Sequence, residues 1–272
     1  MYKCYDLSLP QSDKFFNEVF DLFGKDSFDS FAQGINNKKK HIEKSLHDFY
    51  LGDGSLDASA LKEAWFPNIE SNHIFLSHSH KDKVLAMQLA AMLSENLGLN
   101  VFIDSCVWGY ADELLKEIDD KYAFNEDSRT YSYEIRNRTT SNIYLILQSA
   151  LVTMIDSCEC LIFLNTENTV TSLKSKNQIE TRTSSPWIMS ELQFSSLARR
   201  RLSPYANRSK GMQLVNKAGG TAIDMGFQMS HKLPVDHLTS LTMTNVFNWM
   251  LLSMAKENKG YDALDFLYNT YN

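Results

Sequence analysis

The feature that most constrains the fold is a set of three short, dense apolar runs separated by stretches of helical periodicity. The runs are His73–Ser77, Asn100–Asp104 and Cys160–Asn165. Apolar runs of this length without polar alternation are typical of strands that are buried on both faces. Strands that alternate with helices predict an α/β domain with a parallel sheet and crossover helices.

Helical patterns fill the segments between and after these runs. Residues 82–97 place their leucines and Met92 on one helical face, and Gly98 is a natural helix end. Residues 143–154 predict a second crossover helix. A polar stretch after the third run leads to Pro186, which we expect to open another helix because proline is favoured in a first helical turn.

The first 70 residues differ from the rest of the chain. Six of the 16 phenylalanines lie at positions 15, 16, 20, 23, 28 and 31, mostly at helical spacing. We therefore expect residues 1–70 to form a helical N-terminal extension. Residues 71–250 would form the main domain, with a polar insertion at about 122–140, and residues 251–272 a C-terminal helical segment.

Composition narrows the class of protein. The net charge of −6 argues against a dedicated nucleic-acid binder, which usually carries a basic surface. The sequence has no secretory signal and no apolar stretch near 18 residues, so we expect no membrane partner. The four cysteines lack the spacing of a zinc site, and free thiols fit a cytoplasmic location. His78 and His80 lack a clear partner carboxylate, so no metal is expected.

Ligands of open parallel sheets bind beyond the carboxyl ends of the strands. That rule selects the segments Ser77–Asp82 and Asp104–Tyr110, and the stretch from Asn165 to Trp187. Glycine-rich phosphate loops of the Rossmann and Walker types are absent from the sequence, as is the Gly-x-Ser-x-Gly nucleophile elbow. Asp82 is explained as a helix N-cap.

Three motifs in these segments resemble the bacterial Toll/interleukin-1 receptor (TIR) domain family. Ile74-Phe-Leu-Ser-His-Ser-His-Lys-Asp82 resembles its first strand and loop, and Val101-Phe-Ile-Asp104 its second strand, before the BB loop. Ser185-Pro-Trp-Ile-Met-Ser-Glu191 resembles the Trp-Cys-x-x-Glu motif that carries the catalytic glutamate. The resemblance covers about residues 70–250, and Ile188 replaces the usual cysteine. It implies a flavodoxin-like open sheet with helices on both faces.

The resemblance implies an enzyme that cleaves NAD, with Glu191 as the catalytic carboxylate. Glu191 lies one helical turn after Trp187, so the indole is expected to wall off the ribose. The alternative is a core tryptophan beside a solvated glutamate. The remaining residues that we expect to bind substrate are Phe75, Ser77, His78, Lys81, Asp104 and Trp108.

Several of these residues have a second interpretation. Phe75 serves equally as core packing, and Lys81 as an exposed lysine at a helix start instead of a phosphate contact. Asp104 either bonds a ribose or anchors the BB loop. Trp108 either stacks on a base or packs between protomers, because TIR domains commonly act as homo-oligomers.

The family resemblance implies an NAD glycohydrolase or cyclase of bacterial anti-phage immunity, similar to the TIR-like proteins of systems such as Thoeris. NAD is then the substrate, no separate cofactor is required, and a downstream effector senses the product. The sequence leaves hydrolysis, cyclisation and conjugation open. The alternatives are a non-enzymatic TIR scaffold, which would not need Glu191, and a nucleoside deoxyribosyltransferase-like enzyme, which shares the layout and a catalytic glutamate. A receiver-type phosphoacceptor domain would need an acidic cluster that Asp104 alone does not supply.

Overall fold

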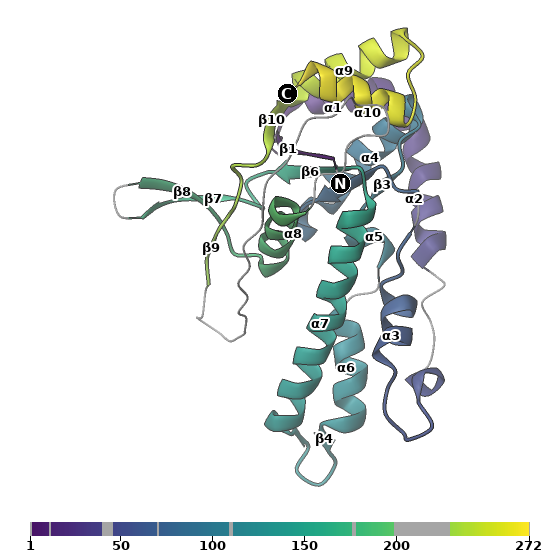
Figure 1. Ribbon diagram of the computed structural model, residues 1–272, viewed down its shortest axis with the longest axis vertical. Coiled ribbons are helices and arrows are strands. Elements are labelled where there is room, and N and C mark those ends of the chain that lie inside the picture. Colours follow the sequence, from purple (N-terminus) through teal and green to yellow (C-terminus); the bar gives the residue numbers. More distant parts are fainter. Residues whose placement is uncertain are drawn as a thin grey trace. The chain divides into compact units, whose positions relative to one another are not determined.

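The chain folds into two compact units. Figure 1 labels the helices and strands of the computed structural model. Unit 1 comprises Met1–Asp29, Ser71–Ile103 and Ile155–Asn272, and unit 2 comprises Ser30–Glu70 and Asp104–Met154. The residues that the structure describes are 2–10, 12–39, 46–69, 71–108, 111–175, 178–198 and 229–271. Gly109 and Tyr110, at the end of the segment Asp104–Tyr110 selected from the sequence, lie outside these residues.

Within the described residues, unit 1 is built on a five-stranded parallel sheet. The strand order across the sheet is β10-β1-β6-β2-β3, and every neighbouring pair is parallel. The strands are β1 (Lys3–Ser8), β2 (Ile74–Ser77), β3 (Val101–Phe102), β6 (Cys160–Asn165) and β10 (Thr239–Thr242). The three strands expected from the apolar runs are therefore present and parallel.

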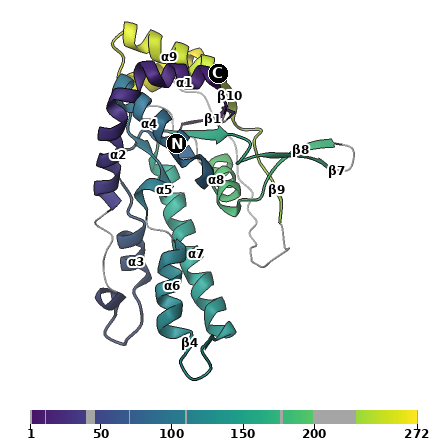
Figure 2. The same ribbon diagram turned by 180° about the vertical axis from the view of Figure 1, so that it is seen from behind.

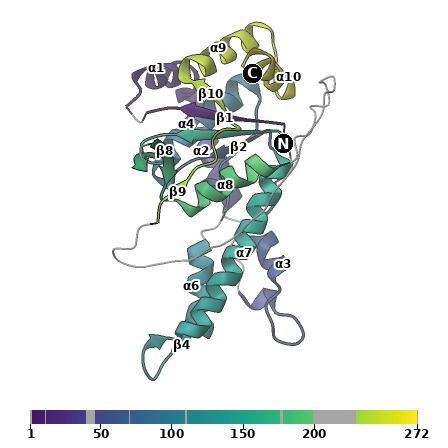
Figure 3. The same ribbon diagram turned by 60° about the vertical axis from the view of Figure 1, so that its left-hand side comes forward.

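Helices cover both faces of this sheet, as expected. On one face α1 (Lys14–Phe23), α4 (Lys83–Leu97) and α9 (Met243–Ala255) pack against one another, and α10 (Tyr261–Thr270) packs on α9. Figure 3 shows α8 (Pro186–Leu197) across the sheet from α1, α9 and α10. The architecture is α/β with a parallel sheet flanked by helices, which is consistent with a flavodoxin-like fold.

The order of the strands places a topological switch point between β2 and β6. From β2 the chain moves outward to β3, and then returns to β6 on the other side of β2. The order β3-β2-β6 therefore matches the first three strands of the flavodoxin-like order 2-1-3-4-5, in which ligands bind at the switch point. Any site on this sheet is expected at the carboxyl ends of β2 and β6.

The helix ends of unit 1 follow from local sequence. Gly98 terminates α4 with a φ of 62°, a left-handed conformation that glycine adopts without strain. Ser185 caps α8 by accepting a hydrogen bond from the backbone N–H of Ile188 at 3.3 Å, and Pro186 occupies the first turn. Both helix boundaries were predicted from the sequence.

The expectation of a helical extension over residues 1–70 is wrong for its first part. Residues 3–8 form β1, which lies inside the sheet between β6 and β10. Lys3 and Asp6 interrupt the apolar residues of this segment, so it lacks the continuous run that marks a fully buried strand. The helices α1 and α3 (Ala58–Trp65) do form, and so does α2 (Lys25–Lys39).

Two further boundaries also differ from the expected ones. The proposed domain boundary at residue 250 cuts through α9, which continues to Ala255. Within the expected helical extension, Leu46–Phe49 form a short 3-10 helix, η2, instead of an α-helix.

Unit 2 contains a helical hairpin in place of the polar insertion expected at about 122–140. Its helices are α6 (Ala111–Tyr122) and α7 (Tyr133–Ser157), which lie side by side in Figures 1 and 2. They are joined by a small antiparallel pair, β4 (Phe124–Asn125) and β5 (Thr130–Tyr131). The polar residues that predicted a loop lie instead in the turn between the two helices and at solvent-facing positions on the helices.

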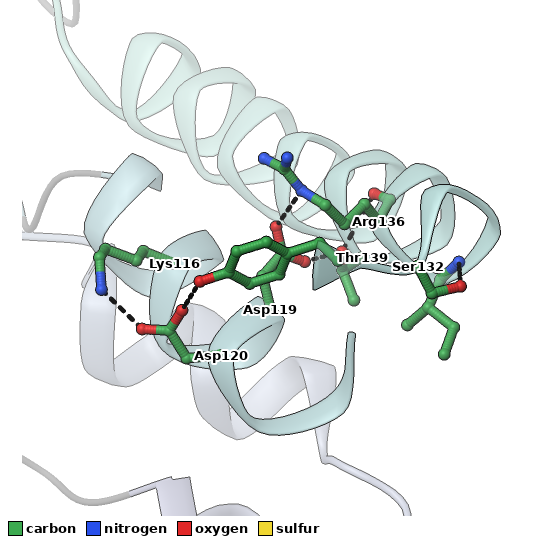
Figure 4. Close-up of polar contacts among 8 residues, drawn as sticks. Lys116, Asp119, Asp120, Ser132, Arg136 and Thr139 are labelled. Atoms are coloured by element: carbon green, nitrogen blue, oxygen red, sulfur yellow. Dashed lines mark hydrogen bonds and ion pairs between the residues drawn. The ribbon is translucent and has the colours of Figure 1, made fainter. Parts of the chain in front are cut away.

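Polar side chains hold the two helices of this hairpin together, as Figure 4 shows. The buried carboxylate of Asp119 on α6 accepts hydrogen bonds from Arg136 Nε at 2.9 Å and from Thr139 Oγ1 at 2.5 Å, both on α7. The neighbouring Asp120 accepts from Lys116 at 2.6 Å and from the Tyr131 hydroxyl. These contacts lower the pKa of the exposed Asp120 carboxyl, chiefly through the hydrogen bond from Lys116.

The polar stretch before α8 also contains structure. Among the described residues, β7 (Thr171–Ser175), β8 (Gln178–Thr183) and β9 (His231–Lys232) form a three-stranded antiparallel sheet in unit 1. The β7–β8 hairpin projects from this unit in Figures 1 and 2. Taking the described residues together, no helix is both long enough and apolar enough to cross a membrane.

Candidate functional site

The candidate site lies where α8 meets the carboxyl end of β2. Ser77 is the last residue of β2, and its side chain faces the sheet side that α8 covers. Glu191 lies in the second turn of α8, whose start is fixed by the Ser185 cap and Pro186. Local helix signals therefore bring a carboxylate to the switch point of the sheet.

A direct hydrogen bond joins the two side chains. Ser77 Oγ donates to Glu191 Oε2 at 2.5 Å, and the residues are 1% and 3% exposed. A hydroxyl donor offsets part of the cost of removing a carboxylate from water. It also fixes the direction in which the carboxylate points. Glu191 is therefore a buried, oriented group and not the solvated helix residue of the alternative interpretation.

His78 follows directly and is also buried, at 7% exposure. Its Nδ1 lies 3.0 Å from the carbonyl oxygen of Leu76. A carbonyl oxygen only accepts, so Nδ1 carries the proton, and in the neutral ring Nε2 is the acceptor. The loop after β2 thus fixes both the position and the tautomer of this imidazole.

A second carboxylate, Asp82, ties together the loops that follow β2 and β6. Its side chain accepts from Thr166 Oγ1 at 2.5 Å and from Asn168 Nδ2 at 2.7 Å, and it is 2% exposed. Asp82 does occupy the N-cap position of α4, but its side chain makes these long-range bonds instead of the expected cap. The bonds hold the two loops at the switch point in a fixed arrangement.

The other predicted substrate residues of unit 1 have different surroundings. Phe75 is fully buried in β2, with its ring centroid 5.5 Å from that of Phe102, which is core packing. Lys81 is exposed in the 3-10 helix η3 (His80–Asp82). Trp187 is half-buried on α8, one turn before Glu191. The structure therefore brings together Ser77 and Glu191, with His78 next in the chain and Trp187 on the same helix.

The two remaining candidates belong to unit 2. Asp104 is the first residue of α5 (Asp104–Val107), and its carbonyl oxygen accepts from the backbone N–H of Trp108 at 3.0 Å. The Trp108 indole is 3% exposed, donates to the carbonyl oxygen of Pro67 at 3.0 Å and packs edge-on against Phe66. The ring is therefore packed within its own chain, and is not presented to a base or to a second protomer.

Asp6 is a half-buried carboxyl group with one buried oxygen, and the sequence did not single it out. Its Oδ2 accepts from Asn165 Nδ2 at 3.2 Å. Its Oδ1 is shielded from solvent and has no hydrogen-bond partner within the described chain. Burial raises the pKa of the Asp6 carboxyl, and the Asn165 bond offsets part of that shift. The available signal was the alternation of Tyr5, Leu7 and Leu9 around it.

Comparisons with protein-family models, curated proteins and solved structures each found no match to this chain. The chemistry of the site follows from its own geometry. That geometry is one oriented carboxylate in a water-poor position, with a serine hydroxyl on it and a tautomer-fixed histidine beside that serine in sequence. Such an arrangement suits the stabilisation of a positive charge that develops during a reaction.

Proposed function

We propose that this chain cleaves the bond between nicotinamide and ribose in NAD, with Glu191 as the catalytic carboxylate. The observation that carries the proposal is the buried Ser77–Glu191 pair at the carboxyl end of β2, beside the switch point of a parallel sheet. The order and content of the three TIR-like motifs supply the choice of substrate.

The reaction needs little acid–base chemistry. The bond between ribose C1′ and the nicotinamide nitrogen breaks, and its electron pair neutralises the positive charge of the pyridinium ring. Nicotinamide leaves as a neutral molecule, so no general acid has to protonate it. The positive charge passes to the ribose, whose transition state resembles the oxocarbenium ion of glycoside hydrolysis.

Glu191 is suited to stabilise that cation. A fixed negative charge in a buried position interacts more strongly with a developing positive charge than it would in water. Ser77 holds the carboxylate in one orientation before substrate arrives, so little reorganisation is needed during the reaction. Trp187 is placed one turn away on the same helix, where its half-buried ring would help to exclude water from the ribose.

The fate of the ribose cation defines the product. Attack by a water oxygen, with loss of one proton to solvent, gives ADP-ribose. Attack by a nucleophile of the substrate itself gives a cyclic product, and attack by another molecule gives a conjugate. In the biological setting that the family resemblance implies, a cytoplasmic homo-oligomer makes this product for a downstream effector during anti-phage immunity.

The proposal is tested by incubating the purified chain with NAD at high protein concentration and measuring nicotinamide by chromatography with mass detection. Glu191→Gln keeps the shape of the side chain and still accepts a bond from Ser77, but it lacks the charge. We expect its rate to fall at least ~100-fold, as when a single stabilising group is removed from other active sites. Glu18→Gln, at an exposed position on α1, is the matched control and should keep the wild-type rate.

The outcomes separate the competing functions. Nicotinamide from the wild type and from Glu18→Gln, but not from Glu191→Gln, supports the proposal, and the mass of the second product distinguishes hydrolysis from cyclisation. Equal rates in wild type and Glu191→Gln would show that Glu191 is the wrong residue. Cleavage of deoxynucleosides but not NAD would favour the deoxyribosyltransferase alternative. Cleavage of neither, with and without lysate from phage-infected cells, would favour a scaffold.

A further inference from the structure

One side of strands β1 and β10 is polar. Their register pairs Asp6 with Ser240 and Ser8 with Thr242, so these four side chains share one side of the sheet; we call them the polar strand face. Ser8, Ser240 and Thr242 are exposed, and Asp6 is half-buried. A parallel sheet is normally covered and apolar on both sides, so an exposed polar side is a departure that needs an explanation.

The opposite side of the same strands is ordinary core. Tyr5, Leu7 and Leu241 are fully buried there. The Tyr5 hydroxyl donates to the carbonyl oxygen of Tyr271, just after α10, at 3.2 Å. The polar strand face therefore looks away from α10 and toward the side of the sheet on which α8 lies.

Register also places the polar strand face on the same side and at the same level as the candidate site. Asp6 pairs with Phe163 of β6, and Phe163 pairs with Ser77 of β2. Paired residues of parallel strands point to the same side of a sheet. Two inter-strand spacings therefore separate Asp6 from Ser77, a backbone distance of about 10 Å.

Asp6 is the chemically distinctive member of this face. Its Oδ1 has no hydrogen-bond partner within the described chain, although nearly all buried polar atoms have one. The residue as a whole is half-buried, but Oδ1 is shielded from solvent, so a ligand on the polar strand face reaches this oxygen only when the carboxyl group turns. The terminal torsion of an aspartate is soft, so the carboxyl group can turn to present the unpartnered oxygen.

We propose that the polar strand face binds the adenosine ribose of NAD, with Asp6 bonded to its hydroxyl groups and Ser240 beside it. A carboxyl group flanked by hydroxyls matches a ribose diol, and an acidic side chain binds a ribose hydroxyl in many dinucleotide sites. The face has no lysine or arginine, so it is not a diphosphate subsite. This inference rests on the proposed function, since the nicotinamide ribose must lie at Glu191.

The test measures binding without turnover. NAD is titrated by calorimetry into the Glu191→Gln chain and into the same chain carrying Asp6→Ala. We expect Asp6→Ala to weaken NAD binding about tenfold, equivalent to one hydrogen bond to a charged or strongly polar group. Nicotinamide mononucleotide lacks the adenosine half, so its affinity should be unchanged. Asp262→Ala, at an exposed position on α10, is the control for loss of a carboxylate.

Two further variants guard against misfolding. Asp6→Asn keeps an acceptor for Asn165 and should lose less than threefold in NAD affinity, and Ser240→Ala changes an exposed side chain and should lose about threefold. Unchanged NAD affinity in both Asp6→Ala and Ser240→Ala would overturn the ribose subsite, as would an equal loss for the mononucleotide. If the wild type cleaves NAD, such a result leaves the proposed function standing. If NAD is neither bound nor cleaved, both proposals fail.

Discussion

The two halves of the parallel sheet are built differently. The central strands β2 and β6 are apolar and buried on both faces, and only Ser77 and Asn165 at their ends depart from this. Strands β1 and β10 alternate instead, with Leu7 and Leu241 on the core side and the polar strand face on the other. The first half therefore supplies stability, while the second half leaves a polar surface at the level of Glu191.

The largest expected difference between the halves is in stability. Phe163 is fully buried in β6, so Phe163→Ala should lower the free energy of unfolding by about 3–5 kcal/mol through lost burial and a cavity. Ser240→Ala on β10 should change it by less than about 0.5 kcal/mol, because the side chain is exposed. Urea denaturation of both variants measures the contrast. Similar losses in the two would mean that the polar strand face is structural.

A smaller effect, on the rate of NAD cleavage, is expected for substitutions of Ser77 at the end of β2. Ser77→Ala removes the hydroxyl that orients Glu191, so kcat for NAD cleavage should fall about tenfold, the worth of one hydrogen bond to a charged group. Ser77→Thr retains the hydroxyl and should recover most of the rate. A Ser77→Ala enzyme with wild-type kcat would show that the bond does not prepare the carboxylate for catalysis.

The smallest effect is a pH dependence of stability that comes from Asp6. Burial raises the folded-state pKa of this carboxyl above its ordinary value of 3.8, so the folded chain holds the proton more tightly than the unfolded chain does. The contribution of Asp6 to the free energy of unfolding is fully present below pH 3.8 and is lost as the pH rises through the folded-state pKa. Asp6→Asn cannot ionise, so its unfolding free energy should gain on that of the wild type as the pH rises through this window, and the difference should stay constant above it. Parallel curves for the two proteins would show that Asp6 is not perturbed.

The same contrast explains which parts of the fold the sequence predicts. Continuous apolar runs marked β2, β3 and β6, and a terminal glycine and a Ser-Pro start marked the ends of α4 and α8. Strand β1 was missed because Lys3 and Asp6 break its apolar pattern, and β10 because Thr239 and Ser240 have no strong hydrophobic signal. Alternating strands at this length resemble loops until their partners are known.

The residues of the site could be predicted from the sequence, but the contacts between them could not. Ser77 and Glu191 were singled out by motif, but they are 114 residues apart, and only the fold shows that they are hydrogen-bonded. Aromatic residues were the weakest guide, because Phe75 and Trp108 are chemically suited to stacking on a ligand and are instead buried in the core of their own units. Asp6 lay in a segment expected to be helical, so its place in the sheet was hidden.

The most direct test of the central claim is a crystal structure of the Glu191→Gln chain with NAD bound. We expect the nicotinamide ribose against residue 191 and Ser77, at the carboxyl end of β2. We also expect the adenosine ribose on the polar strand face, within hydrogen-bond distance of Asp6. NAD bound on the α1, α4 and α9 side of the sheet, or with its nicotinamide ribose away from residue 191, would contradict the claim.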